Sequence, residues 1–375
     1  MEQTREKKRG LAAIFQLCPV RHVLALTSAL VIVLHLLTRD SHAWNRRLSE
    51  GVVRPVHRFL ARATGALPFS LAEVLILAAA IGLFVYIIIE IVHLFQRNQK
   101  KRIVYIIFIT LLSFGLMVYA LFCLLWGVFY YGDDFITRSG LSQREISVEE
   151  LETVTAWFAA LANDYAAQVP RDGDGVCASD RQAVLARSPA LYDAVVADYP
   201  SLAGPRVAPK GFHFSRLLSY TDFTGFFFPF TGEANVNMDF PPSLFAATVA
   251  HELAHQRGVA KEQEANFVAV LASLSDGDPD YCYSACLLAY THLGNALYAA
   301  DRSAWERVYS TLDQAVLRDF AANRAYWQQF ETPVQTVSNT VYEGFLQSYD
   351  QTLGLKSYGA CVDLLVNAFL EEASE

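Results

Sequence analysis

The apolar residues of the chain are concentrated in its first third, in three runs at about 23–38, 70–95 and 103–131. A helix needs about 20 mostly apolar residues to cross the hydrocarbon core of a bilayer. The second and third runs meet this length with few charges, and each predicts a transmembrane helix. The first run is shorter. We predict a third span there, with a cleaved signal peptide as the alternative.

From residue 132 onward the pattern is that of a soluble domain. The segment 147–169 begins with a serine and an acidic first turn, as helices do. The segment 225–242 alternates and holds turn residues, which predicts extended chain. Helical spacing then covers about 244–257, 260–275, 280–299, 303–329, 335–352 and 356–373. The predicted fold class is mainly α, with three N-terminal transmembrane helices and a mostly helical outer domain that includes a small β element.

Basic residues in short loops predict the orientation, because Lys and Arg favour the cytoplasmic side. The segment "QRNQKKR" at 96–102 has four basic residues in seven. The longer loop 39–69 has six arginines at lower density, and we let the denser segment decide. We therefore predict a cytoplasmic N-terminus at 1–22, a membrane domain at 23–131 in the lipid bilayer, and an extracytoplasmic domain at 132–375.

Charge and cysteine content narrow the range of functions. The formal net charge of the 375 residues is −8. The outer domain offers no basic patch, so we expect no nucleic-acid partner. The six cysteines form no CxxC pair, and we interpret them as small buried hydrophobic residues.

The segment "AHELAHQRGVAKEQEANFVA" at 250–269 carries the candidate chemistry. His251 and His255 are four residues apart, so on a helix they share one face and can bind one ion. Glu252 projects to the neighbouring side, where it can take a proton from zinc-activated water as a general base. This HExxH arrangement predicts a Zn²⁺ site.

The residues after the motif supply a third ligand. Gly258 can end the first helix in a left-handed conformation, and a second helix then starts near residue 260. On that helix Glu262 and Asn266 lie on a face of small residues that can approach the first helix. We expect Glu262 as the third zinc ligand and Asn266 as a partner that orients a ligand histidine. Glu264, on the opposite face, is the alternative ligand.

These motifs resemble known families. HExxH followed by "EQEAN" resembles the gluzincin-type metallopeptidases, whose third ligand is a Glu followed four residues later by Asp or Asn. The resemblance to metzincins is superficial, because Lys261 stands where they have a third His. More closely, "FPFTGEANVN", "HELAHQRGVAKEQEANF" and the three leading spans resemble an uncharacterised bacterial membrane family, domain of unknown function 3810. The resemblance implies a membrane-anchored protein with a zincin-like outer domain.

We therefore predict a membrane-anchored zinc metallopeptidase that cleaves a peptide or protein substrate outside the cytoplasm. In zincins an extended strand near the active helix usually pairs with substrate, and the candidate residues are Asn235, Val236 and Asn237. The alternative is that this segment is a structural hairpin under the helix. The candidates for stabilising the oxyanion are His213, Tyr220 and Tyr342, while His292 is interpreted as a surface or interfacial residue. The alternatives are a catalytically silent zincin-like domain that binds metal and serves as a binding or sensor domain, and a membrane scaffold with an accidental motif.

Overall fold

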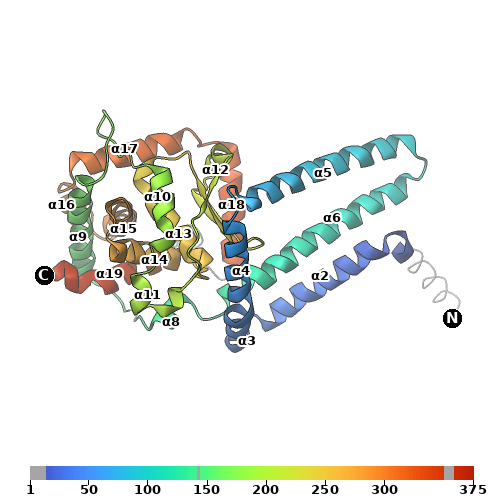
Figure 1. The fold of residues 1–375 in the computed structure, drawn as a ribbon, viewed down its shortest axis with the longest axis horizontal. Coiled ribbons are helices and arrows are strands. Elements are labelled where there is room, and N and C mark those ends of the chain that lie inside the picture. Colours follow the sequence, from blue (N-terminus) through green and yellow to red (C-terminus); the bar gives the residue numbers. More distant parts are fainter. Residues whose placement is uncertain (1–13, 142–143, 350–358) are drawn as a thin grey trace. The chain divides into compact units, whose positions relative to one another are not determined.

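The structure is a computed structural model that describes residues 14–141, 144–349 and 359–375 (Figure 1). The chain divides into two compact units. The first comprises Met1–Val53 and Ala72–Gly132, and the second comprises Arg54–Leu71 and Asp133–Glu375. The division near residue 132 matches the sequence analysis. The segment 54–71, which lies within the predicted membrane domain at 23–131, belongs to the second unit.

The first unit contains three helices that are long and apolar enough to cross a membrane: Pro19–Thr38, Leu71–Gln96 and Lys100–Tyr130. They are α2 (Pro19–Thr38), α5 (Leu71–Gln96) and α6 (Lys100–Phe122), the last continued by the π-helical η2 (Cys123–Gly127) and α7 (Val128–Tyr130). The three predicted membrane helices are therefore present. The first run spans 20 residues because the helix starts at Pro19, before the apolar stretch. The short α3 (His42–Leu48) and η1 (Ser49–Val53) follow it.

Polar contacts join the spans of the first unit. The hydroxyl of Tyr86 on α5 donates to Thr110 Oγ1 on α6 at 3.1 Å. Nε2 of His22 on α2 lies 2.6 Å from the hydroxyl of Tyr105 on α6. A hydrogen bond between apolar helices in lipid typically contributes about 1 kcal/mol, which helps fix their register.

The second unit is mostly helical. Its longer helices are α4 (Arg54–Gly65), α9 (Val148–Ala166), α13 (Phe245–Gln256), α14 (Glu262–Asp276), α15 (Pro279–Ala300), α16 (Arg302–Tyr309), α17 (Gln314–Gln328), α18 (Pro333–Ser348) and α19 (Gly359–Ser374). Shorter elements are α8 (Phe135–Ser139), α10 (Arg181–Arg187), α11 (Val195–Asp198), α12 (Ser215–Tyr220) and the 3₁₀ turns η3 (Ser188–Ala190), η4 (Pro200–Leu202) and η5 (Pro242–Leu244). Figure 1 shows α13, α14 and α15 among the other helices of this unit, and most of their residues are buried.

One predicted helix, 303–329, is in fact two. The chain turns between α16 and α17, where the amide side chain of Asn163 on α9 donates to the carbonyl of Thr311 and accepts from the backbone N–H of Asp313. Because this contact comes from a helix about 150 residues earlier, no local pattern reveals it.

A three-stranded sheet forms the expected β element. It contains β1 (Lys210–Phe212), β2 (Gly225–Phe228) and β3 (Glu233–Asn237), in the order β1-β3-β2. The central strand β3 is parallel to β1 and antiparallel to β2, and all its residues are buried. The helix α13 packs against β3 and β2, so the sheet supports the helix that carries the HExxH motif.

Candidate metal centre

A tight reversal brings α14 back against α13. Gly258 has a φ of +77°, which favours glycine. The backbone N–H of Gly258 bonds to the carbonyl of His255, and that of Val259 bonds to the carbonyl of Ala254. These bonds satisfy carbonyls left open at the helix end. Four residues after Gly258, α14 begins at Glu262, so the chain places this carboxylate directly beside the two histidines.

The side chains of His251, His255 and Glu262 converge. One ligand atom from each lies within 4.8 Å of the other two. Nε2 of His251 is 3.2 Å, and Nε2 of His255 is 3.6 Å, from Oε2 of Glu262. In a tetrahedral zinc site with bonds of about 2.0–2.1 Å, neighbouring ligand atoms are about 3.3 Å apart. The spacing therefore fits one zinc ion held by these three atoms.

A hydrogen bond at Nδ1 orients the ring of each of the two histidines. Nδ1 of His251 donates to Oδ1 of Asn266 at 2.8 Å, and Nδ1 of His255 donates to the carbonyl of Val259 at 2.7 Å. When Nδ1 carries the proton, the lone pair of Nε2 points to the centre of the cluster. Three electron-pair donors then face one point, and a cation there reconciles them.

The charged groups of the cluster shift one another's pKa values. Burial disfavours the ionised form of Glu262, but His255 and His251 hold its pKa well below its ordinary value. Burial lowers the pKa of His255, but the Glu262 carboxylate outweighs that effect and raises it to about 9. Without a metal, a proton on His255 takes the place of the positive charge.

Glu252 lies beside the cluster and is not one of its three converging ligands. Its side chain is buried, and its Oε2 has no hydrogen-bond partner among the described residues. Burial raises the pKa of Glu252 to about 7. A buried carboxylate oxygen without a partner costs free energy, so this side chain does not serve the stability of the fold.

The alternative ligand, Glu264, binds backbone N–H groups outside the cluster. Its carboxylate accepts from the backbone N–H groups of Phe135 at 2.9 Å and Ile136 at 3.3 Å, at the start of α8. Burial raises its pKa. Because both oxygens satisfy a helix N-terminus on the far side of α14, the structure brings Glu262 and not Glu264 to the histidines.

The expected substrate strand lies at the centre of the sheet. Asn235, Val236 and Asn237 belong to β3, whose backbone is paired on one side with β1 and on the other with β2. A central strand has no edge to offer a peptide. The edges of the described sheet are β1 and β2, each of which pairs only with β3. An added Cβ on the first residue of β2, Gly225, would lie 2.7 Å from Cγ and Oε1 of Glu252, so β2 starts directly beside that carboxylate.

The three oxyanion candidates lie in different places. The hydroxyl of Tyr342 on α18 donates to Oε1 of Glu262 at 2.8 Å. Tyr220 packs edge-on against Phe330, and the exposed His213 packs against Phe214. Among the three, the structure therefore places Tyr342 alone at the cluster.

The interpretation of His292 as a surface or interfacial residue is wrong. The residue is buried on α15 rather than exposed. Burial, together with the neighbouring His251, lowers its pKa to about 4. The signal that could have identified it is the apolar stretch around it, "CLLAYTHLGNAL", since a histidine in such a run is normally buried.

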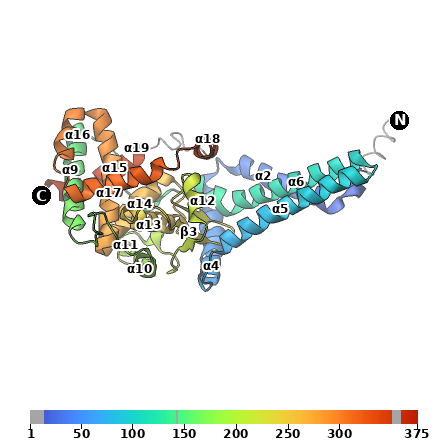
Figure 2. The same cartoon turned by 90° about the horizontal axis from the view of Figure 1, so that it is seen from above.

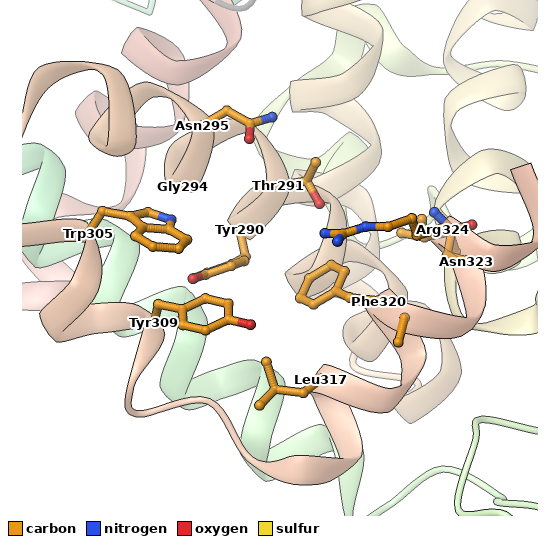
Figure 3. Close-up of a pocket in the computed structure, with 12 residues that line it drawn as sticks. Tyr290, Thr291, Gly294, Asn295, Trp305, Tyr309, Leu317, Phe320, Asn323 and Arg324 are labelled. Atoms are coloured by element: carbon orange, nitrogen blue, oxygen red, sulfur yellow. The ribbon is translucent and has the colours of Figure 1, made fainter. Parts of the chain in front are cut away.

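A separate cavity of about 380 Å³ lies on another face of α15 (Figure 3). Tyr290 is two residues before His292, and positions two apart on a helix point about 200° apart. The hydroxyl of Tyr290 is buried without a hydrogen-bond partner in the described chain. The cavity is also lined by Thr291, Gly294, Asn295, Trp305, Tyr309, Leu317, Phe320 and Arg324. None of the three clustered ligands borders it.

Comparison with known proteins gives one family. A family model described as "Protein of unknown function (DUF3810)" matches residues 48–366. No curated protein and no solved structure matches the chain. The match covers part of the membrane unit and nearly all of the second unit.

Proposed function

The chain belongs to this family of unknown function, DUF3810, and we propose from the site itself that it is a membrane-anchored zinc metallopeptidase. The observation that carries the proposal is the convergence of His251, His255 and Glu262 beside an unused carboxylate, that of Glu252. A structural zinc site is closed by four protein ligands, whereas three protein ligands and an open position are typical of a catalytic site.

In this proposal His251, His255 and Glu262 hold the zinc, while Asn266 and Val259 keep the two imidazole rings in the tautomer that binds it. When bound, zinc supplies a Lewis acid that polarises a carbonyl group and makes water acidic. Protein residues supply the proton transfer and the positioning.

Glu252 acts as the general base. Its raised pKa of about 7 matches the pH at which a base must both accept and release a proton. Oε2 accepts a proton from the attacking water, and the carboxylic acid then gives that proton to the departing amine. The hydroxyl of Tyr342, which donates to Glu262 in this structure, would turn its single O–H from Glu262 to the oxyanion when substrate is bound.

The edge strand β2 is suited to bind the peptide. An extended substrate can add, through backbone hydrogen bonds, to the side of β2 that pairs with no strand of the described sheet. Phe226, Phe227 and Phe228 are half-buried along this strand, and they offer apolar contacts to substrate side chains. Gly225 lets the strand start in contact with Glu252, which would place the scissile bond near the base.

Chain connectivity supports an extracytoplasmic site. The helix α4 packs against β3 within the second unit. In the sequence, the spans α5 and α6 lie between α4 and the rest of that unit. Both ends of this pair of spans therefore lie on one side of the membrane. The basic segment 96–102, between α5 and α6, then lies on the other side of the membrane. Its Lys and Arg residues indicate that this side is the cytoplasm.

Metal content tests the proposal. The full-length protein, purified in detergent without chelators, should contain about one zinc per chain. His255→Ala should lose the metal, and the matched change His213→Ala, at an exposed histidine outside the cluster, should retain it. If wild type and His255→Ala hold equal amounts of zinc, the three residues are not the ligands.

A further inference from the structure

The helix α4 buries polar side chains and exposes apolar ones, which is unusual for a helix at the surface of a soluble domain. Its inward face carries Arg54, His57 and Thr64, all of them buried. Its outward face carries Val56 and Phe59, which are 38% and 70% exposed. Surface helices of soluble domains normally bury the apolar side. Here the polar side is buried and the apolar side is exposed.

The contacts of the inward face fix this orientation. The guanidinium of Arg54 donates to the carbonyl of Ser201 at 3.1 Å, and that of Arg58 donates to the carbonyl of Ala203 at 2.7 Å. The ring of His57 packs edge-on against Phe227 of β2, with centroids 5.1 Å apart. A rotation of the helix that buried Phe59 would break all of these contacts.

The backbone of α4 also approaches the domain closely. Gly232, in the turn between β2 and β3, has a φ of +69°. A Cβ there would lie 2.8 Å from the carbonyl oxygen of His57 and 2.9 Å from the backbone nitrogen of Ala61. The helix α4 and the strand β3 are in contact, and both are labelled in Figure 2. The helix is therefore seated on the hairpin, with its apolar side outward.

The place of α4 in the chain identifies what covers that side. The helix lies between α2, which ends at Thr38, and α5, which begins at Leu71. The linker 66–70 can span at most about 20 Å, so the end of α4 stays close to the start of a membrane-crossing helix. Phe69, in this linker, is 49% exposed. An exposed apolar helix face so close to a span fits the headgroup region of the bilayer.

We infer that the outward face of α4 binds the bilayer surface, with Phe59 and Val56 among the acyl chains. Arg62 is exposed on the same face, where its guanidinium can reach lipid phosphates while its methylenes stay in the apolar layer. The helix thus holds the second unit against the membrane by a contact separate from the three spans.

This contact has a consequence for the substrate, which rests on the proposed peptidase function. The same helix touches Phe227 of β2, the strand proposed to bind peptide. With α4 bound to the bilayer, the proposed peptide site at β2 lies at the membrane surface. The substrate class is then polypeptide held close to the bilayer, such as the outer juxtamembrane segment of another membrane protein.

Spin labels test the membrane contact without any need for activity. All six native cysteines are buried, so a nitroxide attached to Phe59→Cys reports on that position alone. The full chain is placed in nanodiscs of phosphatidylethanolamine and phosphatidylglycerol. The ratio of collisions with oxygen to collisions with a water-soluble nickel chelate should be severalfold higher at Phe59→Cys than at Tyr298→Cys, an exposed aromatic position on α15.

Two results would overturn the inference. An equal ratio at the two positions would mean that α4 faces water, and a label at Phe59→Cys shielded from both reagents would mean that protein covers the helix. Ala63→Cys, on the same outward face, gives a second position should Phe59→Cys fold poorly. A separate assay compares cleavage of a lipid-tethered peptide and the same peptide free in solution. Loss of all cleavage would contradict the peptidase and leave the label result standing, while equal cleavage of both would contradict the membrane-held substrate alone.

Discussion

Oδ1 of Asn266 accepts a hydrogen bond from Nδ1 of His251 across the gap between α14 and α13, at 2.8 Å. This bond selects the histidine tautomer that leaves Nε2 to bind a metal. It joins two residues that the sequence places on separate helices, and it gives the ExxAN part of the motif a physical role.

Replacing Asn266 by Ala should therefore weaken zinc binding by about 10–100-fold, as loss of an orienting partner typically does. Asn266→Asp keeps an acceptor oxygen and should bind more tightly than the Ala variant. Competition with a fluorescent chelator measures both affinities. Asn295→Ala, at the separate cavity, is the control that should match wild type. Equal affinity in Asn266→Ala and wild type would remove Asn266 from the site.

Glu262 and Glu264 should separate metal binding from stability. Glu262→Ala should abolish zinc binding. Glu264→Ala should keep the zinc but lower the free energy of unfolding by about 1–3 kcal/mol, because two backbone N–H groups at α8 lose their acceptor. Elemental analysis and thermal unfolding of the purified chain measure the two effects. The opposite pattern, with zinc lost in the Glu264 variant alone, would make Glu264 the ligand.

Gly225→Ala probes the contact between the edge strand and the base. The new Cβ would lie 2.7 Å from the Glu252 side chain and 2.8 Å from the carbonyl oxygen of Asn235, so the base or the strand must move. A shift of about 1 Å can cost about 10²-fold in rate. We expect that loss in kcat/KM with zinc content unchanged. Gly173→Ala, where a Cβ meets nothing within 4 Å, should retain full activity.

His57 should make the seating of α4 sensitive to acid. Burial lowers its pKa from 6.5 to about 4 in the folded protein. The unfolded chain therefore binds the proton more readily, so the stability is fully present above pH 6.5 and falls as the pH drops toward 4. The loss attributable to His57 is about 2 kcal/mol at pH 5. Thermal unfolding between pH 7.5 and 5 should show a smaller shift in His57→Gln than in wild type. An identical shift in the two proteins would show that His57 does not titrate in this way.

Much of this architecture could be predicted from local pattern. The spans follow from the length of apolar runs, and the turn at Gly258 follows from the glycine itself. The preference for Glu262 over Glu264 followed from helical angles, and the structure places the two carboxylates as those angles indicate.

The remaining features depend on distant parts of the chain. The order of the strands decides whether β3 has an edge, and β1 lies more than twenty residues before it. Tyr342 reaches Glu262 from a helix 80 residues further along. The segment 54–71 joins the second unit because Arg54 and Arg58 on α4 donate to the carbonyls of Ser201 and Ala203. Neither spacing nor composition encodes such contacts, because they arise only when the helices pack.

Glu252→Gln provides the most direct test of the proposed metallopeptidase. Wild type and the variant, each as the full chain in nanodiscs, are compared for zinc content and for hydrolysis of a peptide library followed by mass spectrometry. The variant keeps the shape of the side chain but cannot accept the proton. We expect about one zinc per chain in both, and hydrolysis that falls by about 10²–10⁴-fold in the variant. Equal hydrolysis by the two proteins, or a zinc-loaded wild type that cleaves no peptide, would contradict the account.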